Sequence, residues 1–480
     1  MTQGDEIKAE VVDADLDSRG SVCEMLRIAL PMVVSSSCHT CMTFVDRWFL
    51  SRVGPLHMSA AMGGGIASFM CQTFFVGLIG YTTAIVAQYL GAGKRDRCPL
   101  ALTQAMLVAW VGYPIILLLS LLVRRMFDVS GLPAGQLGLQ KEYFSILIYG
   151  SILMMMHGSL ASYFSGIGRT RVVMLSALVA TVANVVANYA LIYGEWGFPE
   201  LGIRGAAYGT LIGSFLGLMV LVGMYLGRTN RLQFAVGKSL RFSGEVMKKL
   251  LRFGYPAGLE MFLNLMAFTT MVTLFHSDSE ITSTAVTIVF NWDLVSFMPL
   301  VGIQIGVTSL VGRYMGAGRP DIAHRATMSG LRTGVIYAAL VFVGFVFFPE
   351  VLVNMFRPGN PETFRMAVVM VRLASLYVLT DVAIIVFSGA LRGAGDTFWA
   401  MCFSVGAHWI MLSAVIMVLH VLKLSPELAW GMMVTTFMIF SMFVYLRYRG
   451  GKWRNRRVVP DPVEVIATDH DQDFHAMTDI

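Results

Sequence analysis

The feature that most limits how this 480-residue chain can fold is a series of long apolar segments. Each segment is about as long as the 20 residues that a helix needs to cross the hydrocarbon core of a membrane. The segments lack the strict alternation of a half-buried strand, and only helices and closed barrels can satisfy their backbone groups in lipid. The sequence therefore predicts an all-α integral membrane protein with twelve transmembrane helices, at about 25–50, 61–87, 100–123, 143–164, 172–193, 203–226, 251–275, 283–311, 328–349, 366–390, 399–421 and 428–446.

The composition agrees with this class. Hydrophobic residues make up 56% of the chain and charged residues only 14%, whereas soluble domains carry about 25% charged residues. The formal charge of +6 does not indicate a nucleic-acid partner in a chain this apolar. With the N-terminus inside, roughly 24 of the 36 Lys and Arg residues fall on the cytoplasmic side. We expect a monomer in the inner (plasma) membrane with both termini cytoplasmic.

Motifs for other kinds of chemistry are missing from the sequence. It contains no HExxH pair of zinc ligands and no GxxxxGK[ST] nucleotide-binding loop. Cys38 and Cys41 form a CxxC pair, but within an apolar helix, where packing is the more probable role. We therefore expect no enzyme activity, no ATP-driven pump and no bound cofactor or structural metal.

The chain is duplicated. The segment 88–96 (QYLGAGKRD) matches 313–321 (RYMGAGRPD) at an offset of 225 residues, and Pro31 matches Pro256 at the same offset. Such internal repeats in a membrane chain indicate two similar lobes. Six spans per repeat predict lobes that point the same way, related by a pseudo-twofold axis along the membrane normal. The expected parts are a disordered cytosolic tail 1–21, an N-lobe 22–227, a linker 228–247, a C-lobe 248–446 and a cytosolic tail 447–480.

A further set of motifs, taken together and in order, resembles the multidrug and toxic compound extrusion (MATE) family. The resemblance covers roughly residues 22–446 and implies a two-lobed, twelve-helix fold. It also implies export of cationic or amphipathic organic molecules in exchange for Na⁺ or H⁺. A lipid-linked glycan flippase of a related family is the alternative, and it would favour a strongly basic interior. The motifs are FVD at 44–46, VAQYLGAG at 86–93, NVVANYALIYG at 184–194, PAGLE at 256–260, SFMP at 296–299 and LRGAGDT at 391–397.

Three candidate site residues lie in the first repeat. Asp46 follows a polar strip in the first span and matches the family's first-span acid. Its neighbour Arg47 offers a simpler explanation, an ion pair. Asn184 and Asn188 are four residues apart, hence on one helix face, and resemble a cavity-lining pair of the family. Hydrogen bonding between helices is their alternative role.

Four more candidates lie in the second repeat, where charged residues inside a span are costly and usually functional. Glu260 follows the helix-bending Pro256 by one turn, and Asn264 occupies the position where the sodium-linked branch of the family has its acid. We expect this one-turn shift to leave the acid in the same lobe. Asp293 precedes the SFMP motif beside Trp292, which could stack on a cationic substrate or lie at the interface. Asp381 matches the family's tenth-span acid.

The acids suggest the coupling ion but leave its identity open. A carboxylate among hydroxyl and amide oxygens can hold a hard cation such as Na⁺, and a buried carboxylate can also take up and release a proton. Na⁺ could therefore bind at Asp46, Glu260 or Asp381. Asp396 in the LRGAGDT loop is expected to be exposed and to cap a helix. Bending at Pro31 or Pro256 would allow alternating access.

Overall fold

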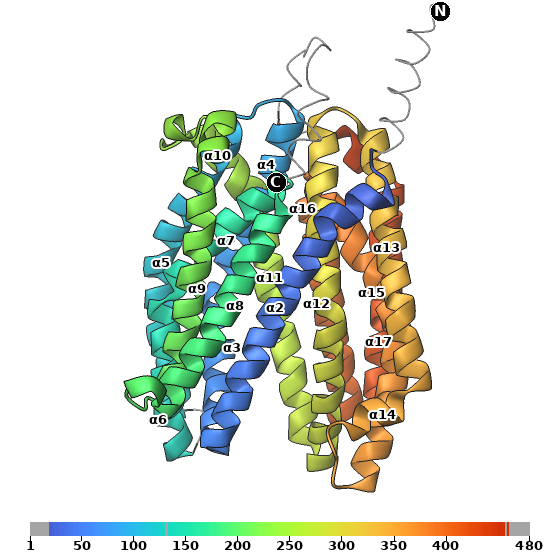
Figure 1. Ribbon diagram of the computed structural model, residues 1–480. Helices are drawn as coiled ribbons and strands as arrows, with labels where there is room; N and C mark the ends of the chain where they lie inside the picture. Colours follow the sequence, from blue (N-terminus) through green and yellow to red (C-terminus); the bar gives the residue numbers. More distant parts are fainter. Residues whose placement is uncertain (1–18, 130–132, 457, 460–480) are drawn as a thin grey trace, which may run out of the picture. The chain divides into compact units, whose positions relative to one another are not determined.

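The structure is a computed structural model that describes residues 19–129, 133–456 and 458–459 (Figure 1). Residues 1–18 of the tail expected to be disordered, and residues 460–480 of the C-terminal tail, lie outside the described residues. Within the described residues all regular elements are helical. The main helices are α2 (Val22–Val53), α3 (Pro55–Gly80), α4 (Thr82–Gly91), α5 (Arg97–Val129), α6 (Ala134–Tyr149), α7 (Ser151–Gly166), α8 (Thr170–Tyr193), α9 (Ile203–Leu226), α10 (Arg228–Phe234), α11 (Gly244–Asp278), α12 (Glu280–Gly316), α13 (Pro320–Phe347), α14 (Pro349–Asn354), α15 (Pro361–Ala394), α16 (Thr397–Ile416) and α17 (Pro426–Arg449).

In the described chain, 11 helices are long and apolar enough to cross a membrane, and the bent pair α6 and α7 can supply a twelfth span. The expectation of twelve spans is therefore confirmed as 11 to 12. The span expected at 143–164 corresponds to the bent pair α6 and α7, which meet at Gly150 with a bend of 46°. A side chain at Gly150 would collide with Leu211 of α9. A break at a glycine inside an apolar run leaves no trace in the hydrophobic pattern.

The described residues form two compact units. Unit 1 holds the residues up to Val33, Gly91–Gly93 and the chain from Leu263 onward, and unit 2 holds Val34–Leu90 and Lys94–Phe262. The divisions fall inside α2 and inside α11, shortly after Pro31 and Pro256. The first helix of each repeat therefore begins in one unit and ends in the other. The lobes expected at 22–227 and 248–446 each contain their whole first helix, so they differ from these units. Their boundaries remain predictions.

In unit 2 the first half of α11 packs on α3 through close backbone contact. A methyl group at Gly77 would lie 2.7 Å from the carbonyl oxygen of Ala257 and 2.8 Å from Cα of Gly258. Phe74 and Tyr255 flank this crossing edge to face, with ring centres 6.1 Å apart. Small residues at such crossings allow helices to approach closely.

Unit 1 repeats this crossing between α12 and the first half of α2. A methyl group at Gly302 would lie 2.5 Å from the backbone nitrogen of Val33. Gly302 is Gly77 plus 225, and Val33 is Gly258 minus 225. The two units thus use equivalent positions for the same contact, which is physical evidence for the duplication.

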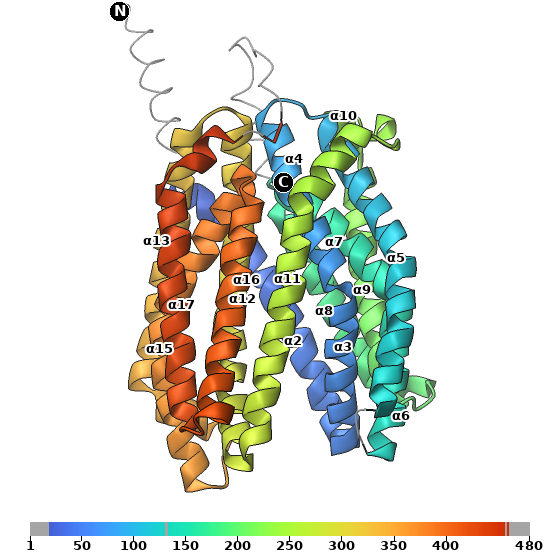
Figure 2. The ribbon, with the colours of Figure 1, turned by 180° about the vertical axis from the view of Figure 1, so that it is seen from behind.

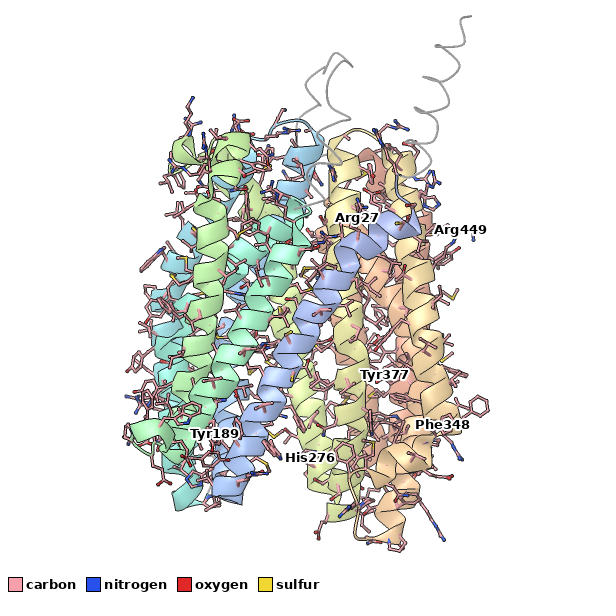
Figure 3. The ribbon with its side chains drawn as sticks, in the orientation of Figure 1. Arg27, Tyr189, His276, Phe348, Tyr377 and Arg449 are labelled. Carbon is pink, nitrogen blue, oxygen red and sulfur yellow. The ribbon has the colours of Figure 1, made fainter. Side chains whose placement is uncertain are left out.

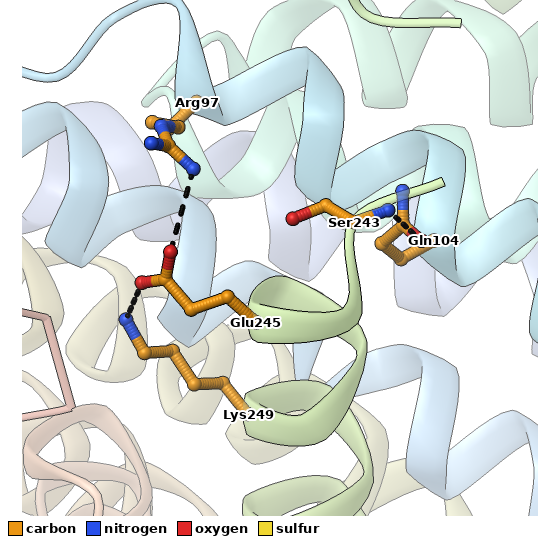
Figure 4. Close-up of polar contacts among 5 residues, drawn as sticks. All are labelled: Arg97, Gln104, Ser243, Glu245 and Lys249. Atoms are coloured by element: carbon orange, nitrogen blue, oxygen red, sulfur yellow. Dashed lines mark hydrogen bonds and ion pairs between the residues drawn. The ribbon is translucent and has the colours of Figure 1, made fainter. Parts of the chain in front are cut away.

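Polar contacts hold the start of each first helix at equivalent positions too. In unit 2, the Gln104 amide donates to the Arg241 carbonyl oxygen at 2.9 Å and accepts from the Ser243 backbone nitrogen at 3.2 Å (Figure 4). The Lys249 ammonium lies 5.6 Å from the centre of the Tyr89 ring. These contacts hold the start of α11 against α4 and α5.

In unit 1, the residues 225 positions from those anchors do the same for α2. The Tyr314 hydroxyl donates to both carboxylate oxygens of Glu24 at 2.8 Å, and Ser329 donates to the Gly20 carbonyl oxygen at 2.6 Å. Residues 314, 24 and 329 correspond to 89, 249 and 104. The side chains that make the contacts differ between the two units, but they stand at equivalent positions of the repeat.

The interior of unit 1 is formed by α12, α13, α15 and α17, which run side by side in both views (Figures 1 and 2). Most side chains of α12 and α15 that face one another are fully buried. Their core includes Trp430 of α17, which is 0% exposed and packs edge to face on Phe275 and Phe290. This core fixes the positions of the polar residues of α12 and α15.

In unit 2, α8 and α9 pack along a row of glycines spaced every four residues. A methyl group at Gly205 would lie 2.5 Å from the Leu191 carbonyl oxygen, and one at Gly213 would lie 2.6 Å from the Ala180 carbonyl oxygen. Residues four apart share one helix face, so the row brings the two backbones together. Between these positions Gly209 leaves the space that the Asn188 side chain occupies.

Candidate functional site

Asp46 lies in the second half of α2, within unit 2, and its carboxylate is held by two other helices. The Asn188 amide of α8 donates to Oδ1, and the Thr210 hydroxyl of α9 donates to Oδ2 at 3.1 Å. The Asn188 amide also donates to the side-chain oxygen Oδ1 of Asn184 at 3.3 Å, and the Asn184 amide donates to the Thr210 hydroxyl at 3.5 Å. All four side chains are buried, with 0% exposure for both asparagines and 7% for Asp46. The three sequence-predicted residues of the first repeat are therefore brought together.

Oxygen atoms of three kinds lie at the Asp46 site, although the Asn188 amide turns its nitrogen, rather than Oδ1, toward the carboxylate. Besides the carboxylate and the Thr210 hydroxyl, the buried Asn188 Oδ1 accepts no hydrogen bond from any described residue. This oxygen points into the space left by Gly209, where a methyl group would collide with it. Carboxylate, hydroxyl and amide oxygens are the ligands that hard cations prefer.

The structure does not support the simpler explanation of Asp46, an ion pair with Arg47. Among the described residues no ion pair links the Asp46 carboxylate to Arg47, and the carboxylate is instead oriented by neutral donors. Thr210 was missed in the sequence because a lone threonine in an apolar helix has no distinctive pattern. The glycine row of α9, which places Thr210 beside α8, could have identified that face.

A second site lies in unit 1, between α12 and α15. The Tyr377 hydroxyl of α15 donates to the Asp293 carboxylate of α12 (Tyr377 is labelled in Figure 3). Asp381 follows Tyr377 by four residues on the same helix face and is 8% exposed. The carboxylates of Asp293 and Asp381 are close enough to act on each other electrostatically. Two acids that were predicted separately thus form one site, and Tyr377, one turn before Asp381, was missed.

Aromatic and polar side chains extend this site across unit 1. The Tyr377 ring stacks on Phe437 with centres 6.0 Å apart, and Phe437 meets the His408 ring edge to face at 5.4 Å. His408 bonds through Nδ1 to the Ser404 carbonyl oxygen at 2.8 Å, and the Ser404 hydroxyl accepts from the Asn264 amide at 2.8 Å. The predicted residue Asn264 therefore connects to the acids through a row of side chains from α11, α16, α17 and α15. Aromatic faces beside carboxylates suit an organic cation.

Glu260 is buried, with 4% exposure, in the part of α11 that belongs to unit 2. Asn264, one turn later, belongs to unit 1. The two residues therefore fall on either side of a division of α11 between Phe262 and Leu263, which the offset of the repeat does not reveal. That the one-turn shift keeps the acid in the same lobe stays a prediction.

Trp292 has a packing role rather than an open aromatic face. Its indole nitrogen donates to the Leu352 carbonyl oxygen of α14 at 3.1 Å, and its ring meets Phe356 edge to face at 6.2 Å. The ring is half-buried against the core of unit 1. The side chain is thus fixed to α14, which argues against the stacking role expected for it.

Asp396 is not exposed, contrary to expectation; it occupies the N-cap position of α16, but its side chain makes no cap hydrogen bond. It is 0% exposed and makes ion pairs with Arg447 at 2.8 Å and Arg456 at 3.2 Å. The short helix Lys452–Asn455 follows α17, and its Trp453 is buried and stacks on Tyr448 with ring centres 5.0 Å apart. The LRGAGDT loop therefore holds the segment after α17 in place, and this acid is structural.

Comparison with known proteins identifies the chain. The MatE family model matches residues 31–190 and 256–418. The chain belongs to the MATE family. The starts of the two matched stretches are 225 residues apart, which is the offset found between the repeated motifs.

Similar proteins extend the match over nearly the whole chain. It is 26% identical to a probable multidrug resistance protein NorM of Thermotoga maritima, over 91% of this chain and 94% of that protein. Its fold resembles that of a MOP superfamily transporter from Pyrococcus furiosus, with a TM-score of 0.82 and 18% identity over 89% of this chain and 95% of that one. An outward-facing multidrug resistance MATE transporter gives a TM-score of 0.81 at 17% identity, over 89% and 95%.

The family assignment confirms several expectations. This MATE protein is a multi-pass, all-helical membrane transporter similar to NorM proteins, and it is not an enzyme. The coupling cation, the substrates and the orientation of the termini are matters for proposal.

Proposed function

We propose that this MATE transporter exports cationic or amphipathic organic molecules in exchange for Na⁺ or H⁺, by alternating access. The observation that carries the proposal is the pair of carboxylates Asp293 and Asp381 within unit 1: the Tyr377 hydroxyl bonds to Asp293, and Asp381 lies one turn after Tyr377 on the same helix. Acids inside spans are expensive and are retained where they bind ions or substrates. Two acids close together repel each other unless a cation or a proton accompanies them.

A cation that relieves this repulsion can exchange for an organic cation. Both need the same negative charge, so occupancy by one disfavours the other, and the competition couples their movements. The aromatic rings of Tyr377 and Phe437 beside the acids suit an organic cation better than a small inorganic anion. The relatives named as multidrug resistance proteins support this choice of substrate class.

The Asp46 site supplies a second place for the coupling cation. Its oxygen donors, Asp46, Thr210 and the free oxygen of Asn188, are those a sodium ion uses, and Asp46 alone could carry a proton. We assign Glu260 a supporting role on the moving part of α11, because it lies one turn after Pro256.

Alternating access needs elements that bend, and α2 and α11 are suited to it. Each contains an internal proline, Pro31 or Pro256, and each passes from one unit to the other soon after that proline. Proline removes a backbone hydrogen bond and allows a kink. Bending there would change the packing of each unit without unfolding its core.

We propose that the protein lies in the plasma (inner) membrane as a monomer, with both termini in the cytoplasm. This orientation rests on the distribution of Lys and Arg, which the positive-inside rule assigns to the cytoplasmic face. The alternative of a lipid-linked glycan flippase finds less support. The charged residues that are buried within the spans, Asp46, Glu260 and Asp381, are acidic, whereas a pyrophosphate-linked substrate needs basic side chains.

The test is uptake of a fluorescent organic cation into proteoliposomes under an imposed Na⁺ gradient or an imposed pH gradient. We expect one gradient to drive uptake and Asp381→Asn to abolish it while the variant still inserts and purifies normally. The matched control is Asp321→Asn, an exposed acid paired with Arg319 at 3.1 Å outside the site. Gradient-driven uptake that is unchanged in Asp381→Asn would remove the basis of the proposal.

A further inference from the structure

Unit 2 carries a surface groove that the transport proposal does not use. The groove has a volume of about 840 Å³ and lies between α3, α5 and the first half of α11. Figure 2 shows these three helices from the side on which α11 is in front. Its apolar lining comes mainly from six side chains: Phe74, Phe75, Leu107, Val111, Leu251 and Tyr255.

Two basic side chains complete the lining, Lys248 and Arg252. They are four residues apart on α11, so they lie on one face of the helix. Both are exposed, and within the described chain neither forms an ion pair with a carboxylate. Arg252 only rests over its neighbour Phe253, with the guanidinium 5.6 Å from the ring centre.

The acid closest to this pair in sequence is already neutralised. Glu245 bonds to Lys249 at 2.7 Å and lies 3.6 Å from Arg97 (Figure 4). Its charge is thus shared between two other cations and does not offset that of Lys248 and Arg252. The groove therefore combines an apolar floor with two positive charges that have no internal partner among the described residues.

The dimensions of the groove fit one leaflet of a membrane. It follows α11 from Gly244 to Tyr255, which at about 1.5 Å per residue is roughly 16 Å. Half of the hydrocarbon core is about 15 Å thick. A lipid chain lying along the apolar side chains would place its headgroup toward the start of α11. Lys248 and Arg252 lie about one and two turns after that start, and long basic side chains in such positions extend toward the headgroup region.

From this geometry we propose that the groove binds an anionic phospholipid, with an acyl chain along α3 and α5 and the phosphate at Lys248 and Arg252. Basic pockets between transmembrane helices recognise anionic headgroups in this way. A second groove of unit 2, of about 620 Å³ between α8 and α9, is lined in the described chain by uncharged residues only. The groove between α8 and α9 should therefore bind charged and uncharged lipids alike, whereas the groove beside α11 should prefer anionic lipids.

The position of the lipid connects it to transport. It lies against the first half of α11, next to the crossing of Gly77 with Gly258 and on the helix proposed to bend at Pro256. A bound lipid would stabilise the packing of α11 on α3 and α5 within unit 2.

The test is native mass spectrometry of the purified full chain in an equimolar mixture of phosphatidylglycerol and phosphatidylcholine. Each basic residue near an anionic lipid strengthens binding about fivefold, so the pair gives roughly a twenty-five-fold preference for phosphatidylglycerol. We expect Lys248→Gln/Arg252→Gln to lose most of this preference. The matched control, Arg124→Gln/Arg125→Gln, removes two exposed charges from the other end of α5 and should keep it.

A second variant tests the apolar part of the groove. Val111 is 68% exposed, and Val111→Trp fills the groove without changing charge, so phosphatidylglycerol occupancy should fall several-fold. Millimolar inorganic phosphate should not displace the lipid, because the acyl chain supplies much of the affinity. The proposal is overturned if the wild-type chain shows no preference, if the Lys248/Arg252 variant keeps it, if the control loses it equally, or if phosphate alone displaces the lipid.

Discussion

Replacing Gly209 by alanine tests the construction of the Asp46 site without touching any of its polar groups. The added methyl group would collide most severely with Asn188 Oδ1, the end of a side chain, and would lie 3.2 Å from the Asn188 backbone nitrogen. The Asn188 amide must then turn away, which breaks its hydrogen bond to the Asp46 carboxylate. The helix backbones of α8 and α9 need to shift by only a few tenths of an ångström.

The expected size of the effect follows from two opposing contributions. A hydrogen bond to a charged group contributes about 1.5–3 kcal/mol, and alanine is favoured over glycine in a helix by about 1 kcal/mol. We therefore expect Gly209→Ala to lose about 0.5–2 kcal/mol of unfolding free energy. Gly223→Ala is the matched control on α9, since a methyl group there meets nothing within 4 Å, and it should be neutral or up to about 1 kcal/mol more stable.

The assays are denaturant titration of the detergent-solubilised protein and cation-driven uptake in proteoliposomes. A loss of about 1.4 kcal/mol in cation binding corresponds to a tenfold weaker site, so the cation concentration for half-maximal uptake should rise about tenfold in Gly209→Ala. If Gly209→Ala and Gly223→Ala behave alike in both assays, Asn188 does not hold Asp46 in the way described.

Further predictions concern unit 1. Tyr377→Phe should cost about 1.5–3 kcal/mol of unfolding free energy and reduce driven uptake. The control is Tyr337→Phe, which loses a bond to the neutral Ser296 carbonyl oxygen at 3.1 Å. It should cost about 0.5–1.5 kcal/mol and leave uptake intact. Equal uptake in the two variants would argue against a role for Tyr377. Asp396→Ala should destabilise the protein by about 1–3 kcal/mol, because it removes the buried carboxylate that holds the partly exposed Arg447 and Arg456. Asp321→Ala, which removes an acid from an exposed ion pair, should cost less than about 1 kcal/mol. Thermal unfolding in detergent compares the two aspartate variants, and equal unfolding midpoints would contradict this account.

The sequence was sufficient to predict the class of fold. Long apolar runs follow directly from crossing a membrane, and the repeated motifs follow from building the fold from two copies of one unit. The sequence was insufficient for the break at Gly150, which interrupts the helix without interrupting its hydrophobicity. The exchange of first helices was also hidden. An offset of 225 relates Gly77 to Gly302, but it does not say which helix each one contacts.

The candidate site shows the same limits. Spacing placed Asn184 and Asn188 on one face, and the structure adds Asp46 to them. The pairing of Asp293 with Asp381 could not be predicted, because α12 and α15 are neighbours only in space. Thr210 was missed because threonine hydroxyls in apolar helices commonly bond to their own backbone, as Thr210 also does to Ala206. Tyr377 was missed because a tyrosine in an apolar helix is usually a packing residue, and only tertiary contacts distinguish one that serves a site.

The most direct test of cation exchange reverses the driving force. Proteoliposomes loaded with an organic cation substrate are diluted into substrate-free buffer, and the movement of Na⁺ and H⁺ is recorded without any imposed ion gradient. We predict that substrate efflux drives one of these cations inward, and that Asp381→Asn removes this movement. Substrate efflux with no movement of either cation would contradict coupled exchange through the buried acids.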